Sequence, residues 1–315
     1  MDRKKELERA FQRGHLLNLK NKQYRNWIRK FIVDETKGDI GIRGDITSNA
    51  LFNGNDKVIE AKVISRSKGV VAGIEEVTFL YRNNGIKVKN IKKDGEKINV
   101  GDTILMLKGR VKDLLKIERS ASDLMERMSG IATLTDNLIK RIGKRVDIAP
   151  TRKTQWRYLD KKAVFVGGGL THRLALWESI LIKDNHLRVL KKYVKFPIEV
   201  AIEKAWKNRD KAIFIEIEVN NKEDAISAAK KFKKLKAKSN RKPCFIMFDN
   251  MKPSEIKLAI EKLKSLDLYD YVLLEASGGI NPENIVEYAR TGVDVISLGY
   301  LTHSSRALNI KQEII

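Results

Sequence analysis

The sequence predicts an α/β protein that ends in a parallel βα-barrel, and three features of the chain indicate this. Short runs rich in β-forming residues alternate with helical patterns from residue 146 to residue 299. Five or more strand–helix units in one series favour a barrel over an open sheet. An earlier region, 57–109, alternates apolar and polar residues as hairpin strands do. A long helical pattern at 112–142 separates the two regions.

The first part of the chain is expected to hold helices and then strands. Residues 4–32 carry apolar residues at helical spacing, and 34–49 is rich in Gly, Asp and Thr, which predicts a loop. Within 57–109 the Asp94–Gly95 pair is typical of a tight turn. At 112–142 apolar residues recur at three- and four-residue steps, which predicts one long amphipathic helix.

Each strand expected in the barrel region is an apolar run that ends in a polar or glycine-containing cluster. Because catalytic groups in βα-barrels lie at the carboxyl ends of the strands, these clusters predict one functional face. The predicted strands are 146–150, 179–183, 214–219, 244–248, 271–276 and 294–299.

The residues at these strand ends sort by charge. Cations come first, then carboxylates, and the last two loops combine glycines with hydroxyls. Such a set predicts an anionic substrate beside a phosphorylated one, with Mg²⁺ held by carboxylates and phosphate held by backbone N–H groups. Alternatively, Glu216 and Glu218, which point to the same side of their strand, could both face solvent. The cations are Arg152, Lys153, His172, Arg173 and Lys183, and the carboxylates are Glu216, Glu218 and Asp249.

Composition limits the remaining function classes. The chain has 315 residues, a formal net charge of +23 and one cysteine, Cys244, so it cannot form an internal disulfide. It contains no apolar run long enough to span a membrane and no secretory signal, which predicts a cytoplasmic protein. The positive charge could indicate nucleic-acid binding. The lysines are spread along the chain, as at 230–242, so a solvated basic surface is the simpler interpretation.

Several motifs, in a fixed order, resemble the quinolinate phosphoribosyltransferase family. The similarity is collinear from Arg43 to Ala307. The motifs are ERSASDLMERMSGIATLT (118–135), TRKT (151–154), GGGLTHRLAL (167–176), LIKDNH (181–186), IEIEV (215–219), MFDN (247–250), LEASGGI (274–280) and GVDVISLGYLTHS (292–304).

The resemblance implies an N-terminal α/β sandwich domain followed by an incomplete TIM-like (β/α) barrel. The implied domains are the sandwich at 41–125 and the barrel at 126–315, whose last residues pack back on the sandwich. A helical extension at 1–40 precedes them and departs from the family pattern. The implied reaction joins quinolinate to phosphoribosyl pyrophosphate and yields nicotinate mononucleotide, pyrophosphate and carbon dioxide for NAD biosynthesis. Mg²⁺ is the implied cofactor, and a homodimer or a multiple of dimers is the implied assembly.

The resemblance also implies roles for particular residues. Those that hold the pyridine dicarboxylate are Arg119, Arg152, Lys153, His172, Arg173 and Lys183, with Arg119 reaching into the partner's site. Lys153, Glu218 and Asp249 are the implied catalytic residues, and Glu218 and Asp249 also lie near the ribose and Mg²⁺. The implied 5′-phosphate set is Ser277, Gly278, Gly279, Ser297, Gly299 and His303.

Two departures from the family pattern adjoin the expected pocket. Gln155, Trp156 and Arg157 replace a turn containing Thr-Pro-Gly, and 121–123 reads Ala-Ser-Asp in place of Ala-Leu-Asn. Trp156 could stack on an aromatic ligand or pack within the protein. These changes leave open phosphoribosyl transfer to another aromatic or heteroaromatic acid. A second alternative is an inactive relative that binds nucleic acid through its basic surface.

Overall fold

The computed structural model describes residues 2–237 and 242–315 and divides this part of the chain into two compact units. The lysine-rich run 230–242 lies partly outside the described residues. The bounds expected from the sequence made each domain one continuous stretch, whereas each unit combines three. The barrel unit comprises Met1–Arg13, Asn137–Arg157 and Gly169–His303, and the sandwich unit comprises Gly14–Asp136, Tyr158–Gly168 and Ser304–Ile315.

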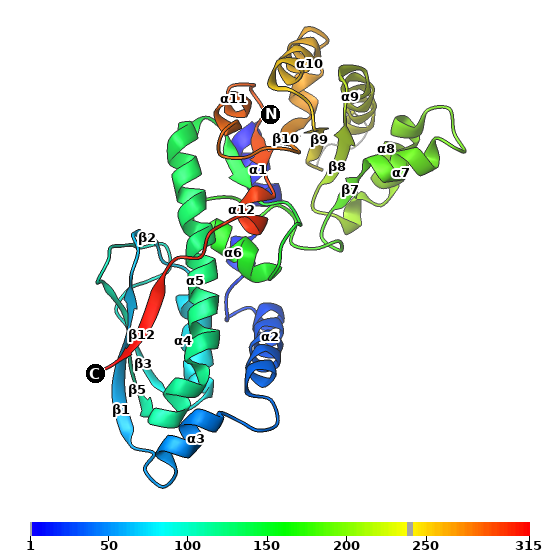
Figure 1. Cartoon of the computed structure of the whole chain (residues 1–315). Coiled ribbons are helices and arrows are strands. Elements are labelled where there is room, and N and C mark those ends of the chain that lie inside the picture. Colours follow the sequence, from blue (N-terminus) through cyan, green and yellow to red (C-terminus); the bar gives the residue numbers. More distant parts are fainter. Residues whose placement is uncertain (1, 238–241) are drawn as a thin grey trace. The chain divides into compact units, whose positions relative to one another are not determined.

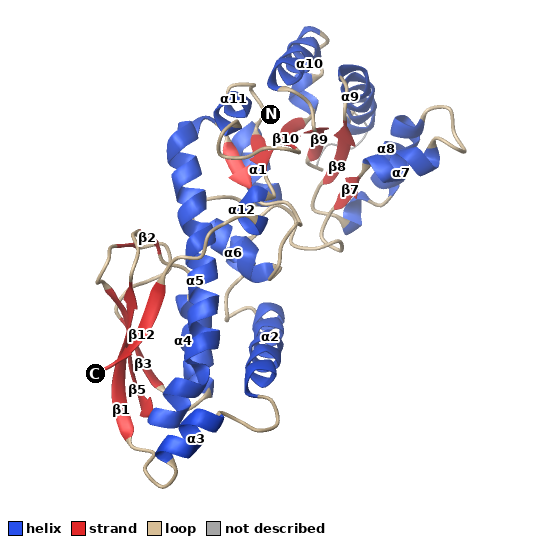
Figure 2. Ribbon diagram, in the orientation of Figure 1, coloured by secondary structure: helices blue, strands red, loops and turns tan. Residues whose placement is uncertain are grey.

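The barrel unit is built on a six-stranded parallel sheet with the order β6-β11-β10-β9-β8-β7 (Figure 2). Among the described residues no ladder joins β6 to β7, so the barrel is incomplete, as the resemblance implied. All six strands predicted in this region are confirmed. They are β6 (Asp147–Ala149), β7 (Ile180–Ile182), β8 (Ile215–Val219), β9 (Cys244–Asp249), β10 (Leu273–Ser277) and β11 (Val295–Ser297).

Local sequence signals explain where the helices between these strands begin. Asn221 caps α9 by accepting a hydrogen bond from the backbone N–H of Asp224, and Pro253 opens α10, where its missing N–H has no cost. Buried apolar side chains of α9 and α10 pack on the sheet. The helices of this unit are α1 (Arg3–Phe11), α7 (Asp184–Leu190), α8 (Pro197–Lys207), α9 (Lys222–Lys236), α10 (Pro253–Ser265), α11 (Ile285–Ala289) and α12 (Tyr300–His303) (Figure 1).

Inward-facing side chains of the barrel stack in three layers, because successive residues of a strand point to opposite faces. At the amino ends of the strands lies an apolar layer, which packs against Leu7 and Phe11 of α1. Two glutamates enter the middle layer, and the layer at the carboxyl ends is polar. The apolar layer includes Phe245, Leu273 and Val295, the two glutamates are Glu216 and Glu275, and the side chains that line the cavity at the carboxyl ends include Glu218, Met247, Asp249, Ser277 and Ser297.

The sandwich unit contains an antiparallel sheet with the order β12-β1-β5-β3 and a small two-stranded sheet of β2 and β4. Its C-terminal strand pairs with β1. The helix expected at 112–142 is confirmed as α5 (Val111–Ile142). No described helix is both long and apolar enough to cross a membrane. The strands are β1 (Val58–Ser65), β2 (Gly69–Val70), β3 (Lys87–Asn90), β4 (Lys97–Ile98), β5 (Thr103–Arg110) and β12 (Ile310–Ile314), and the other helices are α2 (Lys22–Ile40), α3 (Ile46–Phe52), α4 (Ile74–Asn83) and α6 (Tyr158–Val166).

Two predictions for the first fifty residues are wrong. The helix expected at 4–32 is interrupted between α1 and α2, because Asn21 caps a new helix by accepting hydrogen bonds from two backbone N–H groups. The loop expected at 34–49 is instead largely helical. There α2 continues until Gly41, whose positive φ of 58° ends it, and Asp45 caps α3.

A buried charged cluster links three helices of the sandwich unit. Lys162 Nζ of α6 lies 2.5 Å from Glu75 Oε2 and 2.5 Å from Glu76 Oε1 at the start of α4. The hydroxyl of Tyr24, on α2, donates to Glu76 Oε1 at 2.8 Å. Burial and then Glu76 raise the pKa of Asp94 to about 6, although Lys162 opposes them. One lysine therefore offsets three neighbouring carboxyl groups.

Replacing Lys162 with Met should destabilise the protein by about 3–5 kcal/mol at pH 7, because Glu75 and the buried Glu76 lose the cation with which they pair. A carboxyl group whose pKa is raised by folding stabilises the folded state when it takes up a proton. The loss should therefore shrink as the pH falls from 7 through the pKa of about 6 of Asp94. Urea unfolding at pH 5 and pH 7 measures both effects.

The matched control is Lys108→Met, which removes an exposed ion pair with Glu60 from the same unit. It should change the free energy of unfolding by less than about 1 kcal/mol at either pH. Equal effects of the two substitutions would contradict the role given to the buried cluster.

Candidate active site

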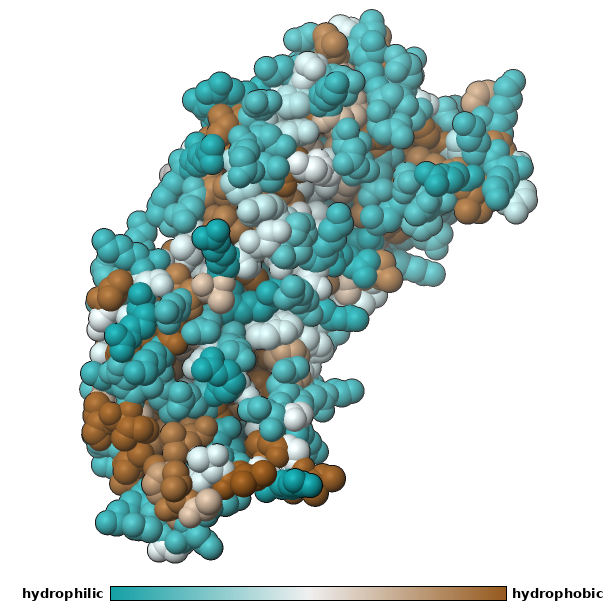
Figure 3. All heavy atoms as spheres, in the orientation of Figure 1, coloured by the Kyte–Doolittle hydropathy of each residue, from teal (hydrophilic) through white to brown (hydrophobic). Residues whose placement is uncertain are grey.

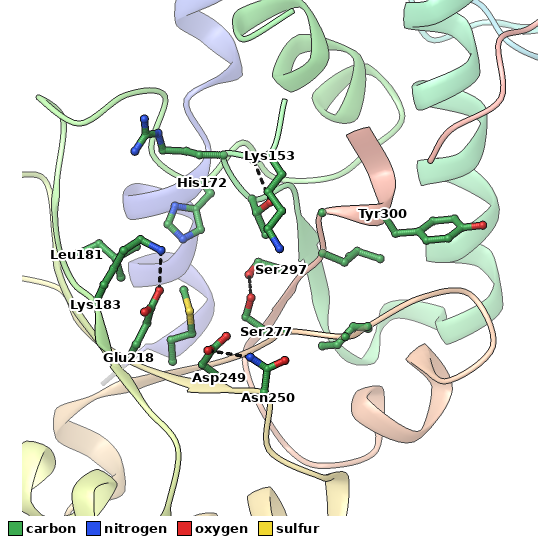
Figure 4. Close-up of a pocket in the computed structure, with 18 of the residues that line it drawn as sticks. Lys153, His172, Leu181, Lys183, Glu218, Asp249, Asn250, Ser277, Ser297 and Tyr300 are labelled. Atoms are coloured by element: carbon green, nitrogen blue, oxygen red, sulfur yellow. Dashed lines mark hydrogen bonds and ion pairs between the residues drawn. The ribbon is translucent and has the colours of Figure 1, made fainter. Parts of the chain in front are cut away.

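A cavity of about 750 Å³ lies at the carboxyl ends of the barrel strands (Figure 4). Every residue of the substrate set expected from the sequence lines this cavity, except Arg119. The loops and strand ends that carry these residues lie far apart in the sequence, and the structure brings them together at one place. The alternative that Glu216 and Glu218 face solvent is wrong, since both side chains are buried.

Cationic groups on one side of the cavity lack anionic partners. Arg173 is only 3% exposed, and its Nη1 donates to the carbonyl of Ser179 at 2.9 Å, whereas its Nε has no hydrogen-bond partner in the described chain. Burial lowers the pKa of Arg173, yet an arginine stays charged in proteins. Arg152 and Lys153 line the same cavity, and the described residues form no ion pair with them. This wall is electrostatically suited to an anion.

The opposite wall holds carboxylates. Lys183 Nζ lies 2.9 Å from Glu218 Oε1, and the backbone N–H of Asp184 donates to Glu218 Oε2 at 3.2 Å. Figure 4 shows Lys183 and Glu218 facing each other across the cavity edge. Asp249 accepts a hydrogen bond from the side chain of Asn250 at 2.9 Å. The charge of Lys183 is thus partly neutralised by Glu218, whereas Arg152 and Arg173 form no ion pair within the described residues.

At the floor of the cavity, which it helps to line, His172 meets the two glutamates of the middle layer. Its Nε2 lies 3.3 Å from Glu216 Oε2 and 3.4 Å from Glu275 Oε2, and all three side chains are buried. Burial and then Glu275 raise the pKa of Glu216 to about 8, against the opposing effect of His172. Burial alone would lower the pKa of His172, but Glu275 and Glu216 outweigh it and raise that pKa. The group therefore retains protons at neutral pH.

His172, Glu216 and Glu275 could in principle hold a metal ion, since their ligand atoms lie within 4.8 Å of one another. The hydrogen bonding of the imidazole favours a proton there instead. His172 Nδ1 accepts the backbone N–H of Arg173 at 2.6 Å, so Nε2 must carry the ring's proton and point it at the glutamates. A metal-binding nitrogen needs a free lone pair, which Nε2 then lacks.

Two glycines shape another side of the cavity. Gly278 has a φ of 88°, and a Cβ there would lie 2.5 Å from Asn250 Oδ1, so only glycine fits. A Cβ at Gly299 would lie 3.0 Å from His303 Cδ2 and 3.2 Å from Lys153 Cδ. The N–H groups of both glycines make no hydrogen bond within the described residues. They remain available to an anion bound in the cavity.

Two residues at the site, Glu275 and Tyr300, were missed at the level of sequence, and Asn250 was recognised only as part of the polar cluster after its strand. Glu275 lies inside an apolar strand, and this single carboxylate among apolar neighbours was the available signal. Asn250 has a φ of 56°, and its N–H donates to the carbonyl of Ser277 at 2.9 Å, which fixes the turn after β9. Tyr300 lines the cavity beside the glycine loop, and no pattern distinguished it.

Two other expected residues lie elsewhere. Arg119 belongs to α5 of the sandwich unit, where it is exposed and pairs with Asp123 at 3.2 Å. It does not line the cavity of its own chain. Trp156 is not among the residues that line the cavity either.

Comparison with known proteins matches nearly the whole chain to one family. The model of the quinolinate phosphoribosyl transferase C-terminal domain matches residues 131–313, and that of the N-terminal domain matches residues 45–129. A Methanothermobacter thermautotrophicus protein named "Probable nicotinate-nucleotide pyrophosphorylase [carboxylating]" is 38% identical over 90% of this chain and 97% of its own length. The "Nicotinate-nucleotide pyrophosphorylase [carboxylating]" of Mycobacterium leprae is 33% identical over 84% of this chain and 89% of its own length.

Solved structures agree with the sequence matches. The nicotinate-nucleotide pyrophosphorylase of Ehrlichia chaffeensis is 32% identical with a TM-score of 0.75, covering 91% of this chain and 98% of its own. That of Francisella tularensis is 29% identical with a TM-score of 0.77, covering 92% and 96%. From the two matched domains, the shared fold and these identities it follows that the chain belongs to the quinolinate phosphoribosyltransferase family.

Proposed function

We propose that this protein converts quinolinate and phosphoribosyl pyrophosphate to nicotinate mononucleotide, pyrophosphate and carbon dioxide in NAD biosynthesis. The observation that carries the proposal is a buried arginine, Arg173, with an unpaired Nε in a cavity that Arg152 and Lys153 also line. Glu216, Glu218 and Glu275 favour the charge of Arg173 from nearby without forming an ion pair to it, so an anionic ligand can offset the remaining cost of burying the guanidinium. The name of the matched family, quinolinate phosphoribosyl transferase, agrees with a pyridine dicarboxylate as this ligand.

The two carboxylates of quinolinate suit the cationic wall. Guanidinium groups bind carboxylates through paired hydrogen bonds, and such bonds are stronger where water is excluded. Arg152, Lys153 and Arg173 supply these donors, and Lys183 can add its charge at the edge of the cavity. His172 acts through the hydrogen bond by which its Nδ1 accepts the backbone N–H of Arg173 and so positions that residue.

Transfer begins when the ring nitrogen forms a bond to the anomeric carbon of the ribose as pyrophosphate leaves. Positive charge that develops on the ribose is stabilised by Glu218 and Asp249, which face the same cavity. The ring nitrogen is then positively charged, so it stabilises the carbanion left when carbon dioxide departs. A proton from solvent completes nicotinate mononucleotide. Orientation and electrostatics supply most of the acceleration in this scheme, with Lys153 countering the charge of the leaving pyrophosphate.

Mg²⁺ fits the carboxylate wall better than it fits the buried histidine group. Glu218 and Asp249 offer only oxygen atoms, beside room for substrate phosphates and water, which is the environment this ion prefers. Mg²⁺ would neutralise charge on the departing pyrophosphate. The 5′-phosphate would be held by N–H groups of Gly278, Gly279 and Gly299 with the side chains of Ser277 and His303. Ser297 supports Ser277 through a 3.0 Å hydrogen bond.

We also propose a cytoplasmic homodimer, or a multiple of dimers, in which Arg119 completes the partner's site. An exposed arginine outside its own cavity supports this. The sandwich unit also exposes a set of apolar side chains, visible in Figure 3 as brown atoms where β1, β12 and α3 lie. Such a patch is typical of an interface. Its residues are Ile42, Ile46, Leu51, Val58, Ile314 and Ile315.

The alternative acceptor acid is not favoured by the site. It was motivated by the altered loop at 155–157, and the residues of this loop do not line the cavity. The cations that would distinguish a dicarboxylate from other acids are all present.

Purified protein given quinolinate, phosphoribosyl pyrophosphate and Mg²⁺ should release pyrophosphate and nicotinate mononucleotide. Lys153→Ala should lower kcat/KM by about 100-fold or more, because a charge aimed at the reacting groups is lost. Chromatography of the nucleotide product measures both. If the wild-type protein forms no more product than Lys153→Ala, the proposed reaction is wrong.

Mixing Arg119→Ala protein with Lys153→Ala protein should restore about a quarter of wild-type activity, since half of the dimers are mixed and each has one intact site. Subunit exchange is verified by recovering one tag through the other. If exchanged mixtures remain as inactive as the separate variants, Arg119 does not complete the partner's site.

A further inference from the structure

The segment that carries Arg173 into the cavity has almost no regular secondary structure. Residues 169–178 connect α6 to β7, and we call them the arginine loop. Within this loop His172 has a φ of 53°, a left-handed conformation that non-glycine residues adopt only when their surroundings enforce it. Contacts from elsewhere in the barrel unit must therefore hold the loop.

The end of α1 supplies such contacts to the backbone of the loop. The carbonyl of Phe11 accepts the N–H of Thr171 at 2.9 Å and the hydroxyl of Thr171 at 2.6 Å. The N–H of Arg13 donates to the same hydroxyl at 2.9 Å. Thr171 lies two residues before Arg173, so these bonds fix the loop next to the guanidinium that faces the cavity.

An ion pair holds the other end of the loop. Arg13 Nε lies 3.0 Å from Glu178 Oε1, and Glu178 Oε2 accepts the backbone N–H of Leu174 at 2.5 Å. The side chain of Glu178 is 1% exposed, which makes its charge dependent on Arg13. Arg13 is thereby connected, through one carboxylate, to the residue that follows Arg173.

The ring of Phe11 packs directly beneath the site. Its centroid is 4.2 Å from that of His172 and 4.6 Å from that of Phe245, and the side chain is fully buried. His172 in turn accepts the N–H of Arg173. Phe11 thus forms the floor on which the imidazole next to Arg173 rests.

These contacts come from a part of the chain that neither family model covers, since the matches begin at residue 45. We propose that α1 is a positioning element of the active site, an inference that rests on the function proposed above. Phe11 and Arg13 hold the arginine loop in the conformation that directs Arg173 into the cavity, and so they set the affinity for the pyridine dicarboxylate. They touch no substrate themselves.

The chain offers a matched control at the other end of the same helix. Arg3 pairs with Asp294 through two nitrogens and also donates to the carbonyl of Tyr269, without contacting the arginine loop. Arg3→Gln and Arg13→Gln each remove one ion pair between α1 and a largely buried carboxylate. Both should lower the melting temperature, whereas only Arg13→Gln should disturb the site.

Arg13→Gln should raise KM for quinolinate about tenfold while KM for phosphoribosyl pyrophosphate stays within about twofold, which corresponds to a selective loss of dicarboxylate binding. Phe11→Leu, which keeps an apolar side chain in the core, should act in the same direction. Arg3→Gln should leave both KM values unchanged. If Arg13→Gln keeps the wild-type KM for quinolinate, or if both arginine variants change it alike, the proposal is overturned.

Hydrogen exchange gives a readout that does not require turnover. The amides of Thr171 and Leu174 should exchange at least about tenfold faster in Arg13→Gln and at the wild-type rate in Arg3→Gln. If the wild-type protein is inactive, the proposed reaction is wrong. Hydrogen-exchange rates of the loop amides would still show whether α1 holds the arginine loop. Unchanged exchange in Arg13→Gln would show that the loop does not depend on the helix.

Discussion

A buried guanidinium that forms no ion pair within the described residues is the constraint on which the rest of the site depends. Arg173 is nearly inaccessible and keeps one nitrogen unsatisfied, with Arg152 and Lys153 lining the same cavity. Such an arrangement is unfavourable in the free protein, and an anionic ligand relieves it. The barrel tolerates it because packing and hydrogen bonds elsewhere stabilise the loop. Stability is thus traded for a preorganised binding site.

The three layers of the barrel separate the functions of support and chemistry. Phe11 and its apolar neighbours fill the amino end of the barrel, as a conventional core does. The middle layer is charged, and His172 with Glu216 and Glu275 retains protons there, because three buried groups of this kind cannot all take their usual charge. The polar top layer lines the cavity. The middle layer lies between them, close to the cationic wall.

Much of the fold could be predicted from local patterns. Apolar runs bounded by glycine and polar turns identified all six barrel strands, and the periodic spacing of apolar residues identified α5. The break between α1 and α2 was missed although Asn21 is a good helix cap, because helical spacing on both sides made the pattern look continuous. Spacing shows that a helix has an apolar face without showing what that face will contact. The spacing predicted that Phe11 lies on an apolar face, for example, but could not show that its ring packs on His172.

For the candidate site, too, local patterns predicted one part and missed another. The residues that line the cavity could be collected by reading each strand end, since parallel strands bring their carboxyl ends together. The burial of Glu216, its pairing with Glu275 and the contact of Arg13 with Glu178 depend on segments far apart in the sequence, so no local pattern contained them. Arg119, on α5, shows the limit of a single chain, since its expected role needs a partner subunit.

A crystal structure with pyridine-2,3-dicarboxylate bound would test the central claim most directly. The account predicts electron density for the ring acid in the cavity, with one carboxylate within hydrogen-bond distance of the guanidinium of Arg173 and the other close to Arg152 or Lys153. Density for the acid at another place, or a guanidinium of Arg173 that pairs with a carboxylate of the protein while the cavity holds only water, would contradict it.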